Sequence, residues 1–468
     1  MTTLTPAAID ELKTALGPAG WTQDADVIAP HLVEWRGAWN GQTQIMLTPR
    51  STDDVAKAVT ICARHGVAIT PQGGNTGLVG GQIPHGEVLL SLGRMRAVRR
   101  VEPLEDVMVV EAGLTLLEAQ QIAADHGRVF PLSLAAEGTA TIGGVISTNA
   151  GGTAVLRYGV ARDLVLGLEA VLPDGSIFHG LKRLRKDNTG YDLKHLLIGA
   201  EGTLGVVTAA ALKLFPIMRS RATAVVGVET PTAALELLAV AKAETGGGVE
   251  AFELMNRQGL DLVFAHIPDT RHPLETPTPW AVLIELVSGE PKAAERAMQR
   301  LLEDAFERGL ITDAAVAQTE AHAAQFWRIR EDMSAAQKAA GGGWKHDVSL
   351  PLTAIPDFID RAHSALIASF PGIRLVTFGH LGDGNLHYNV VPPVGEDPST
   401  FAARKADGAR IVHDIVGELE GSISAEHGLG RLKSEEALRY KDPAQVAAMR
   451  AVRAALDPRR IMNPGVLF

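Results

Sequence analysis

Residues 71–81 read PQGGNTGLVGG, a run of five glycines in eleven positions. A βαβ pattern precedes it, with strand-like TQIMLTPRS at 43–51, helical TDDVAKAVTICARHG at 52–66 and a second strand, VAITP. Thr52 is the expected N-cap of that helix, and Gly66 lies just past its end. Glycines at this density let the backbone approach a ligand closely and aim its N–H groups at an anion. The stretch therefore predicts an anion-binding turn, with a plain surface loop as the alternative.

The glycine spacing argues against two common nucleotide sites. No Gly-Lys-Ser/Thr ending follows, as a P-loop requires, and glycines at positions 73, 74, 77, 80 and 81 do not fit G-x-G-x-x-G. An ordinary Rossmann nicotinamide site is therefore not expected. The anion would instead be held by backbone groups together with the side chains of Asn75 and Thr76.

Two further glycine-rich segments follow, at 130–159 and at 186–205. The first contains two Gly-Gly pairs around Ser147, Thr148 and Asn149, and the second ends in GAEGTLG before the strand VVTAAALKLF. Small residues at this density suit a backbone wrapped around a large, flat ligand. Three such segments in one block imply a sizeable cofactor rather than a lone phosphate.

The pattern changes after residue 217. Long amphipathic helices alternate with strands such as AVLIELVSG, which predicts an α+β or α/β region. Further on, FGHLGDGNLHYN at 378–389 places His380 and His387 on either side of a Gly- and Asp-rich turn, with strand-like residues before and after it. A β-hairpin that holds two imidazoles side by side is expected.

A second glycine-rich turn, SAEHGLGRLK at 424–433, contains Glu426 and His427. Two imidazoles and a carboxylate form a typical open zinc site with a coordination position left for substrate. The sequence spacing alone does not bring Glu426 to the hairpin, so packed or surface histidines remain the alternative.

Composition narrows the class of protein. At 468 residues two or three domains are expected, and the net charge of −10 argues against nucleic acid as a partner. No apolar run approaches the ~20 residues of a membrane span. The N-terminus reads as a helix capped by Thr5, with Pro6 at its first position, rather than as a secretory signal. The single cysteine, Cys62, excludes Cys-rich metal sites and fits a reducing cytoplasm.

Taken together, the motifs PQGGNTGLVGG, TIGGVISTNAGG, LRKDNTGYDLK, GAEGTLG, GHLGDGNLHYN and SAEHGLG occur in the order of a known group. The chain resembles the FAD-linked oxidases of the vanillyl-alcohol oxidase type, in the branch of D-2-hydroxyacid dehydrogenases. The closest likeness is to the D-2-hydroxyglutarate dehydrogenases, through KDNTGYDLK, WKHDVSLP and the hairpin. The resemblance implies an α+β protein, in which a two-subdomain FAD-binding fold is joined to an α+β substrate domain with an antiparallel sheet.

The same resemblance implies a division of the chain and a set of flavin contacts. Residues 1–216 would bind FAD, 217–421 would bind substrate, and 422–468 would return to the flavin. Some relatives hold FAD covalently through a histidine near the pyrophosphate loop, which this chain lacks, so non-covalent FAD is expected. The expected cofactor-binding residues are Gly73, Gly74, Asn75, Thr76, Gly77, Gly81, Ser133, Gly138, Thr141, Gly143, Gly144, Ser147, Asn149, Gly152, Glu201, Val206 and Asn463.

For the chemistry, the resemblance maps the metal ligands to His380, His387 and Glu426, and the catalytic base to His427. Zinc is expected from the ligand types, with manganese or cobalt as alternatives. An imidazole has an unperturbed pKa near ~6.5, which suits a base that works near neutrality.

The expected substrate contacts are Arg330, Ser334, Lys345 and Asn389. Ser334 stands where dicarboxylate-specific relatives commonly carry threonine, which keeps the hydroxyl but leaves its contact in doubt. A second cation beside Arg330 favours D-2-hydroxyglutarate or D-malate, although a lysine before a strand is often only a solvated surface charge.

The resulting hypothesis is FAD- and metal-dependent oxidation of a D-2-hydroxy acid, with hydride passing from C2 to flavin N5. Electrons would leave to an electron-transfer flavoprotein or a quinone, and a homodimer is expected. The alternatives are a D-lactate, glycolate or broad D-2-hydroxyacid dehydrogenase, a metal-dependent hydrolase that binds a nucleotide, and a flavin-family transferase without net oxidation.

Overall fold

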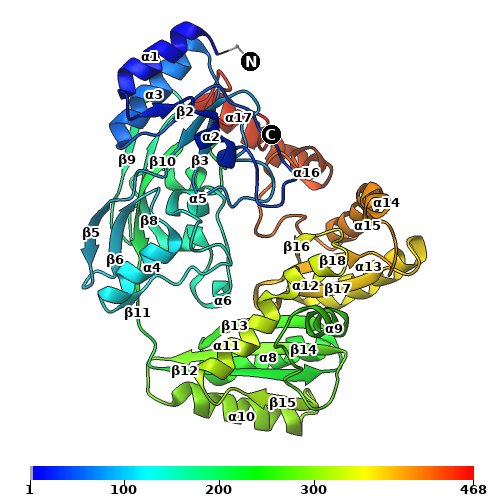
Figure 1. The fold of residues 1–468 in the computed structure, drawn as a ribbon. Coiled ribbons are helices and arrows are strands. Elements are labelled where there is room, and N and C mark those ends of the chain that lie inside the picture. Colours follow the sequence, from blue (N-terminus) through cyan, green and yellow to red (C-terminus); the bar gives the residue numbers. More distant parts are fainter. Residues whose placement is uncertain (1–3) are drawn as a thin grey trace. The chain divides into compact units, whose positions relative to one another are not determined.

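A computed structural model describes residues 4–468 of the chain, which forms two compact units (Figure 1). Unit 1 consists of the residues up to Gly152, Tyr158–Ile217 and Glu426–Phe468. Unit 2 consists of Thr153–Arg157 and Met218–Ala425. Unit 1 is therefore discontinuous in sequence, since almost all of unit 2 is inserted between its second and third segments.

Unit 1 contains a mixed four-stranded sheet and an antiparallel five-stranded sheet. The first has the order β1 (Trp21–Thr22), β2 (Met46–Leu47), β4 (Val88–Ser91), β3 (Ile69–Gln72). The second has the order β5 (Val98–Glu102), β6 (Val107–Glu111), β10 (Val206–Lys213), β8 (Val165–Val171), β9 (Ile177–Gly180). A small pair joins β7 (Arg128–Val129) to β11 (Phe215–Pro216). Because β2 and β3 both run parallel to β4 and are linked by a helix, the predicted βαβ unit is confirmed.

Helices of unit 1 begin where the sequence places capping residues. The Thr5 hydroxyl accepts a hydrogen bond from the Ala8 N–H at the start of α1, with Pro6 first in the helix, as predicted. The helices are α1 (Pro6–Leu16), α2 (Ala25–Ile28), α3 (Thr52–His65), α4 (Leu116–Asp125), α5 (Ile142–Ser147), α7 (Lys194–Leu197), α16 (Ser434–Tyr440) and α17 (Pro443–Leu456). Short 3-10 turns are η1 (Ala29–His31) and η2 (Ala161–Leu164), and α6 (Val155–Tyr158) crosses the sequence boundary between the units.

One capping prediction was wrong. The N-cap of α3 is Ser51, whose hydroxyl accepts the Asp54 N–H at 3.1 Å, and not Thr52. Thr52 is instead the first helical residue, and its hydroxyl donates to the carboxylate of Glu169, 2.5 Å away on β8. The predicted end of the helix at Gly66 is confirmed, since Gly66 adopts φ +67° there.

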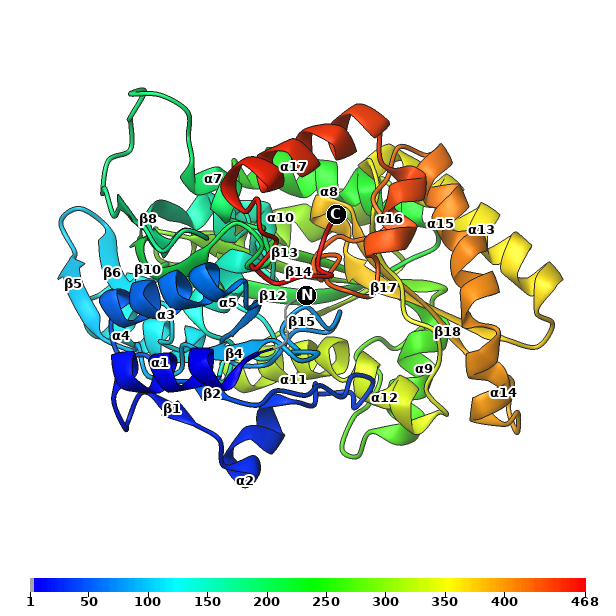
Figure 2. The same ribbon diagram turned by 90° about the horizontal axis from the view of Figure 1, so that it is seen from above.

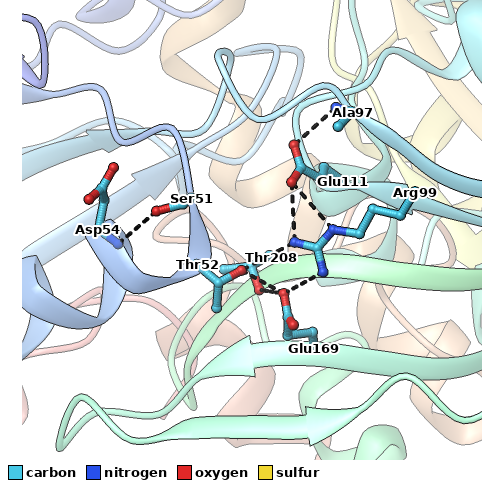
Figure 3. A network of polar contacts seen from close by, with 8 residues as sticks. All are labelled: Ser51, Thr52, Asp54, Ala97, Arg99, Glu111, Glu169 and Thr208. Atoms are coloured by element: carbon cyan, nitrogen blue, oxygen red, sulfur yellow. Dashed lines mark hydrogen bonds and ion pairs between the residues drawn. The ribbon is translucent and has the colours of Figure 1, made fainter.

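Thr52 belongs to a polar network that fastens α3 to the five-stranded sheet (Figure 3). The Glu169 carboxylate also accepts hydrogen bonds from Arg99 on β5 and Thr208 on β10, each at 3.0 Å. Arg99 in turn contacts Glu111 at the end of β6. A buried carboxylate with three donors is satisfied, so the network joins α3 to the five-stranded sheet without leaving an uncompensated charge.

The last segment of unit 1 is built into its first sheet. Ile69 on β3 forms a parallel bridge with Met462, and the Asn463 N–H donates to Ile69 O at 2.8 Å. Arg453 of α17 is 4% exposed and donates to the carbonyl oxygens of Val466 at 2.6 Å and Met462 at 3.0 Å. These contacts fix the backbone of residues 461–466.

Unit 2 is organised around one antiparallel seven-stranded sheet. The strand order is β15 (Asp313–Val316), β12 (Ser220–Val228), β14 (Trp280–Ser288), β13 (Val249–Asn256), β17 (Arg374–His380), β18 (Asn385–Val391), β16 (Asp347–Ser349). Apolar side chains of α9, α11 and α12 pack on one face of it, while α8 and α10 contact β12 and β14. Figure 2 shows α13 and α15 side by side.

The helices of unit 2 are α8 (Pro231–Thr245), α9 (Arg257–His266), α10 (Ala293–Glu307), α11 (Glu320–Glu331), α12 (Met333–Ala339), α13 (Ile355–Ser369), α14 (Pro398–Ala403) and α15 (Lys405–Glu418). A 3-10 turn, η3 (Leu352–Ala354), precedes α13, and another, η4 (Leu381–Asp383), joins β17 to β18. The predicted hairpin is confirmed, because β17 and β18 pair antiparallel from Arg374 opposite Val391 to Phe378 opposite His387.

Candidate active site

A large cleft in unit 1 is lined by the glycine-rich segments. Its cavity volume is about 340 Å³, and its lining residues fall within 71–92, 134–152 and 201–207 and also include Glu426, His427 and Asn463. Pockets of ~300–1000 Å³ hold drug-sized ligands. The cleft is therefore within the size range of known ligand-binding sites.

The first wall of the cleft depends on close backbone packing. A Cβ atom added at Gly74 would lie 1.8 Å from the carbonyl oxygen of Thr139, and one at Gly73 would lie 2.2 Å from the Thr141 hydroxyl. Only glycine allows the two loops to approach this closely. Thr141 also caps α5, so the loop after β3 lies against the start of that helix.

Glu201 and Asn463 join the remaining walls. The Glu201 carboxylate accepts the N–H groups of Leu429 at 2.9 Å and Gly430 at 2.8 Å, which follow His427 in sequence. The Asn463 side-chain amide donates to the carbonyl oxygens of Gly81 and Glu201, each at 2.8 Å. Burial raises the pKa of Glu201 to about 7, and the two N–H donors oppose the shift.

Asn463 also supplies a test of whether a flavin fits. Its side-chain carbonyl oxygen is buried and has no hydrogen-bond partner among residues 4–468. A buried acceptor at the wall of a cleft is expected to meet a donor, and the isoalloxazine ring carries such an N–H group. The glycine cradle and this acceptor both fit FAD.

Most of the sequence-predicted cofactor residues line this cleft, but three do not. Ser133 bonds to Glu137 at 3.1 Å, Asn149 accepts the N–H of Arg162 at 2.9 Å, and Gly138 is exposed. Gln82 lines the cleft although the sequence reasoning passed over it, and its amide holds the Gly77 carbonyl oxygen at 2.8 Å. The predicted flavin contacts themselves remain predictions.

In unit 2, the predicted hairpin histidines lie on one face of the sheet. His387 stands opposite Phe378, and residues two apart on a strand share a face, so His380 and His387 point to the same side. Their ring centroids are 6.0 Å apart, and His380 is buried. Asp347 of β16 stands opposite His387 on that face as well.

Glu253 is a member of this site that the sequence reasoning missed. It lies on β13 directly opposite His380 and is 1% exposed. One carboxylate oxygen is 2.5 Å from His380 Nδ1, and the other accepts a hydrogen bond from Arg330 Nε at 2.6 Å. Burial by itself would raise the pKa of Glu253, but the charges of Arg330 and His380 hold it at about 2.

The predicted substrate residues lie around the same face. Arg330, near the end of α11, is 9% exposed and has its guanidinium carbon 4.8 Å from the centre of the Phe378 ring. The Trp344–Val390 bridge continues the register between β16 and β18, which puts half-buried Lys345 opposite buried Asn389. Ser334 is exposed on α12.

Glu426 and His427 begin the last segment of unit 1. The Glu426 carboxylate accepts the Gly152 N–H at 3.3 Å, and both side chains are half-buried in the lining of the glycine-rich cleft. In unit 2, the residue before them, Ala425, donates its N–H to Asp347 O at 3.3 Å. The backbone that leads into Glu426 is therefore fixed to the strand that pairs with the hairpin.

Comparison with known proteins decides the family. Residues 217–467 match the family described as "FAD linked oxidases, C-terminal domain", and residues 43–180 match a family described as "FAD binding domain". The chain belongs to the FAD-linked oxidases. The sequence-based resemblance is thus confirmed, and the protein is an FAD-dependent D-2-hydroxyacid dehydrogenase that acts on a small hydroxy acid.

Two relatives illustrate the likeness at the level of sequence. The D-2-hydroxyglutarate dehydrogenase of Bos taurus is 38% identical over 443 residues, covering 94% of this chain and 80% of its own. A D-2-hydroxyglutarate–pyruvate transhydrogenase of Saccharomyces cerevisiae is 34% identical over 452 residues, covering 95% and 90%. An oxidase family leaves the hydrolase alternative without support.

Solved structures confirm the expected α+β fold class. p-Cresol methylhydroxylase superposes with a TM-score of 0.77 over 98% of this chain and 96% of its own, at 16% identity. At that identity the likeness concerns the fold alone. The vanillyl-alcohol oxidase type of FAD fold is therefore shown for this chain.

The expected cytoplasmic location was wrong. Relatives from Arabidopsis thaliana and Bos taurus are named mitochondrial proteins, which contradicts it. The inference had rested on a single reduced cysteine, and a cysteine count does not distinguish between compartments that keep thiols reduced. Among residues 4–468, no helix is both long enough and apolar enough to cross a bilayer.

Proposed function

We propose that this protein oxidises D-2-hydroxyglutarate to its 2-oxo acid, and that it accepts D-malate by the same chemistry. The substrate loses a hydride from C2 and a proton from its hydroxyl. The observation that supports this substrate class is a face of unit 2 with two cationic side chains, Arg330 and Lys345, near a pair of histidines. One cation suffices for a monocarboxylate, whereas a dicarboxylate uses both.

FAD supplies the hydride acceptor, at flavin N5, when it is bound. The chain's own contribution is a cleft whose glycine loops offer backbone N–H groups to the pyrophosphate. Asn463 offers a buried acceptor oxygen to the ring. The pyrophosphate loop at 71–81 contains no histidine, so the proposed attachment is non-covalent.

A divalent metal, zinc by ligand type, is the second proposed cofactor. His380, His387 and Glu426 would hold it, and a bound cation lowers the pKa of a coordinated hydroxyl. The contacts of His380 support it as a metal ligand, because the Glu253 carboxylate beside it can only accept hydrogen bonds. That carboxylate therefore accepts a hydrogen bond from Nδ1–H of His380, and in the neutral ring Nε2 then carries the lone pair that a metal needs.

His427 is the proposed base. It would take the hydroxyl proton as the hydride leaves C2, which together amount to a two-electron oxidation of the substrate. Its position rests on Glu201, which holds the backbone two and three residues further on. The proton is thereby accepted on a side chain of a fixed loop rather than by bulk water.

Arg330 is proposed to bind a substrate carboxylate through its terminal nitrogens, because its Nε is already engaged by Glu253. Lys345 would meet the distal carboxylate, and Asn389 would add a polar contact. Ser334, exposed on α12, would offer its hydroxyl to the substrate.

The runner-up function is a D-lactate, glycolate or broad D-2-hydroxyacid dehydrogenase. It differs from the first proposal only at the far end of the substrate, where no second carboxylate has to be bound. For the electron acceptor we keep the expectation of an electron-transfer flavoprotein or a quinone, and for the assembly a homodimer.

The deciding experiment is anaerobic bleaching of the flavin, read near ~450 nm, by a panel of D-2-hydroxy acids with and without a chelator. D-2-Hydroxyglutarate should bleach the flavin at a lower concentration than D-lactate does. Chelation should stop the bleaching without releasing FAD, and added Zn²⁺ should restore it. Faster bleaching by D-lactate or glycolate would favour the runner-up, and full activity after verified metal removal would refute the metal's role.

A further inference from the structure

The central feature of the unit 2 site is a buried charged triad, formed by Arg330, Glu253 and His380. Glu253 lies in the middle of β13, between apolar Phe252 and Leu254, and is 1% exposed. Its two oxygens serve two different partners, His380 Nδ1 at 2.5 Å and Arg330 Nε at 2.6 Å. A single carboxylate thus touches both a proposed metal ligand and a proposed substrate contact.

A purely structural reading of such a triad is not favoured by energetics. Burying three ionisable groups costs several kcal/mol of desolvation per ion, and well-packed apolar residues in their place are often as stable or more so. The neighbouring positions of β13 show that the strand accommodates apolar side chains. Stability alone therefore does not account for a charge at this position.

We propose that Glu253 is a positioning residue, whose one carboxylate orients His380 for metal binding and Arg330 for substrate binding. This inference rests on the proposed function and adds to it a residue outside the predicted metal and substrate sets. Glu253 itself would touch neither metal nor substrate.

On the His380 side, the carboxylate fixes which ring nitrogen can bind a metal. A carboxylate offers only acceptor atoms, so it holds a proton on Nδ1, and in the neutral ring that binds a metal the lone pair is then on Nε2. Carboxylates that accept from metal-binding histidines in this way typically contribute ~10–100-fold to metal affinity. The antiparallel register places Glu253 directly opposite His380, which brings the carboxylate within 2.5 Å of Nδ1.

On the Arg330 side, the carboxylate takes up Nε and leaves the two terminal nitrogens of the guanidinium. Those nitrogens can bind a carboxylate in a bidentate manner. The guanidinium also lies over the Phe378 ring, at 4.8 Å from its centre. Arg330 is therefore held from its Nε edge and from one face of the plane.

The chain offers a matched control on the neighbouring strand. Glu285 lies on β14, is 5% exposed, and bonds to Arg221, to Thr223 at 2.9 Å and to Trp327 at 3.0 Å. Trp327 belongs to α11, as Arg330 does. Glu285→Gln therefore removes a buried, Arg-paired carboxylate that also contacts α11, and its three partners are Arg221, Thr223 and Trp327 rather than His380.

The experiment compares Glu253→Gln with Glu285→Gln in the full-length holoenzyme. In Glu253→Gln the amide cannot accept from both partners, and its NH₂ group favours the other His380 tautomer, which carries its proton on Nε2. We expect the zinc dissociation constant, measured by competition with a chromogenic chelator, to rise ~10–100-fold. KM for D-2-hydroxyglutarate should also rise, while Glu285→Gln leaves both quantities within about twofold and lowers only the melting temperature.

A second variant guards against misfolding. Glu253→Asp keeps the charge but is one methylene shorter, so it can satisfy one partner only, and it should weaken either zinc binding or substrate binding more than the other. Unchanged zinc affinity and KM in a folded Glu253→Gln or Glu253→Asp enzyme would overturn the inference while leaving the proposed function intact. Failure of the wild-type enzyme to bind zinc would overturn both the metal proposal and this inference.

Discussion

The loop that carries His427 is anchored by Glu201, and Glu201→Gln tests how much that anchor contributes. At pH 8, above the raised pKa of about 7, the carboxylate is ionised and accepts two backbone N–H groups at 2.9 and 2.8 Å. Glutamine keeps one acceptor oxygen and turns an NH₂ group toward the other N–H.

The expected loss follows from these contacts. A hydrogen bond to a charged group contributes about 1.5–3 kcal/mol, and a buried donor left without an acceptor costs about 1–3 kcal/mol. The two terms partly describe the same lost hydrogen bond, so they are not simply added. We expect the free energy of unfolding to fall by about 3 kcal/mol. For a unit of this size that is a fall of roughly 6–12 °C in Tm.

The assay measures Tm of the holoenzyme at pH 8 together with kcat for D-2-hydroxyglutarate. Since an error of ~1 Å in placing a reacting group can cost ~100-fold in rate, kcat should fall by more than tenfold in Glu201→Gln. Glu169→Gln is the control: Glu169 is also 9% exposed and accepts three hydrogen bonds, but it belongs to the network that fastens α3. If both variants lose similar stability and both retain wild-type kcat, Glu201 does not position His427.

Three further predictions concern single residues. Lys345→Ala should raise KM for D-2-hydroxyglutarate at least tenfold more than KM for D-lactate in a dye-coupled assay, and equal effects would contradict its assignment to the distal carboxylate. His427→Ala should lower kcat by ~100–10,000-fold while the visible flavin spectrum persists, as expected for loss of a general base; a wild-type rate would assign the proton to another group. For Glu169, burial opposes ionisation, but the Thr52, Arg99 and Thr208 donors outweigh it and hold the pKa below its ordinary value of 4.5. The stability that this carboxylate contributes is present above pH 4.5 and is lost as the pH falls further, so Glu169→Gln should show a shallower loss of Tm below pH 4.5 than wild type.

Local sequence signals predicted the elements of the fold well, because their causes are local. The α1 start at Thr5-Pro6, the end of α3 at Gly66 and the hairpin at 378–389 each follow from a few neighbouring residues. The N-cap of α3 was misplaced by one residue, since Ser51 and Thr52 both carry hydroxyls that can cap a helix. The choice between them depends on Glu169, more than a hundred residues away, because its carboxylate accepts a hydrogen bond from the Thr52 hydroxyl.

The candidate site was predictable only where a motif carried it. His380 and His387 share one short stretch, whereas Glu253 is 127 residues from His380 and meets it through the β13–β17 register. The available signal was the pair of glutamates, Glu250 and Glu253, inside the otherwise mostly apolar strand VEAFELMN, and that signal does not identify their partners. Pairing of distant strands depends on the whole sheet, so no local pattern could have assigned it.

The bridge between Ile69 and Met462 has a consequence for how the protein is made. A ribosome that has finished β3 must translate all of unit 2 before it reaches the segment that lies beside that strand. At ~5–20 residues per second, synthesis of the insertion from Met218 to Ala425 takes roughly 10–40 s. During that time β3 lacks the segment around Met462 that lies beside it. Flavin capture should therefore be a late event that follows synthesis of Asn463, and a nascent chain halted before that residue should emerge without the yellow cofactor.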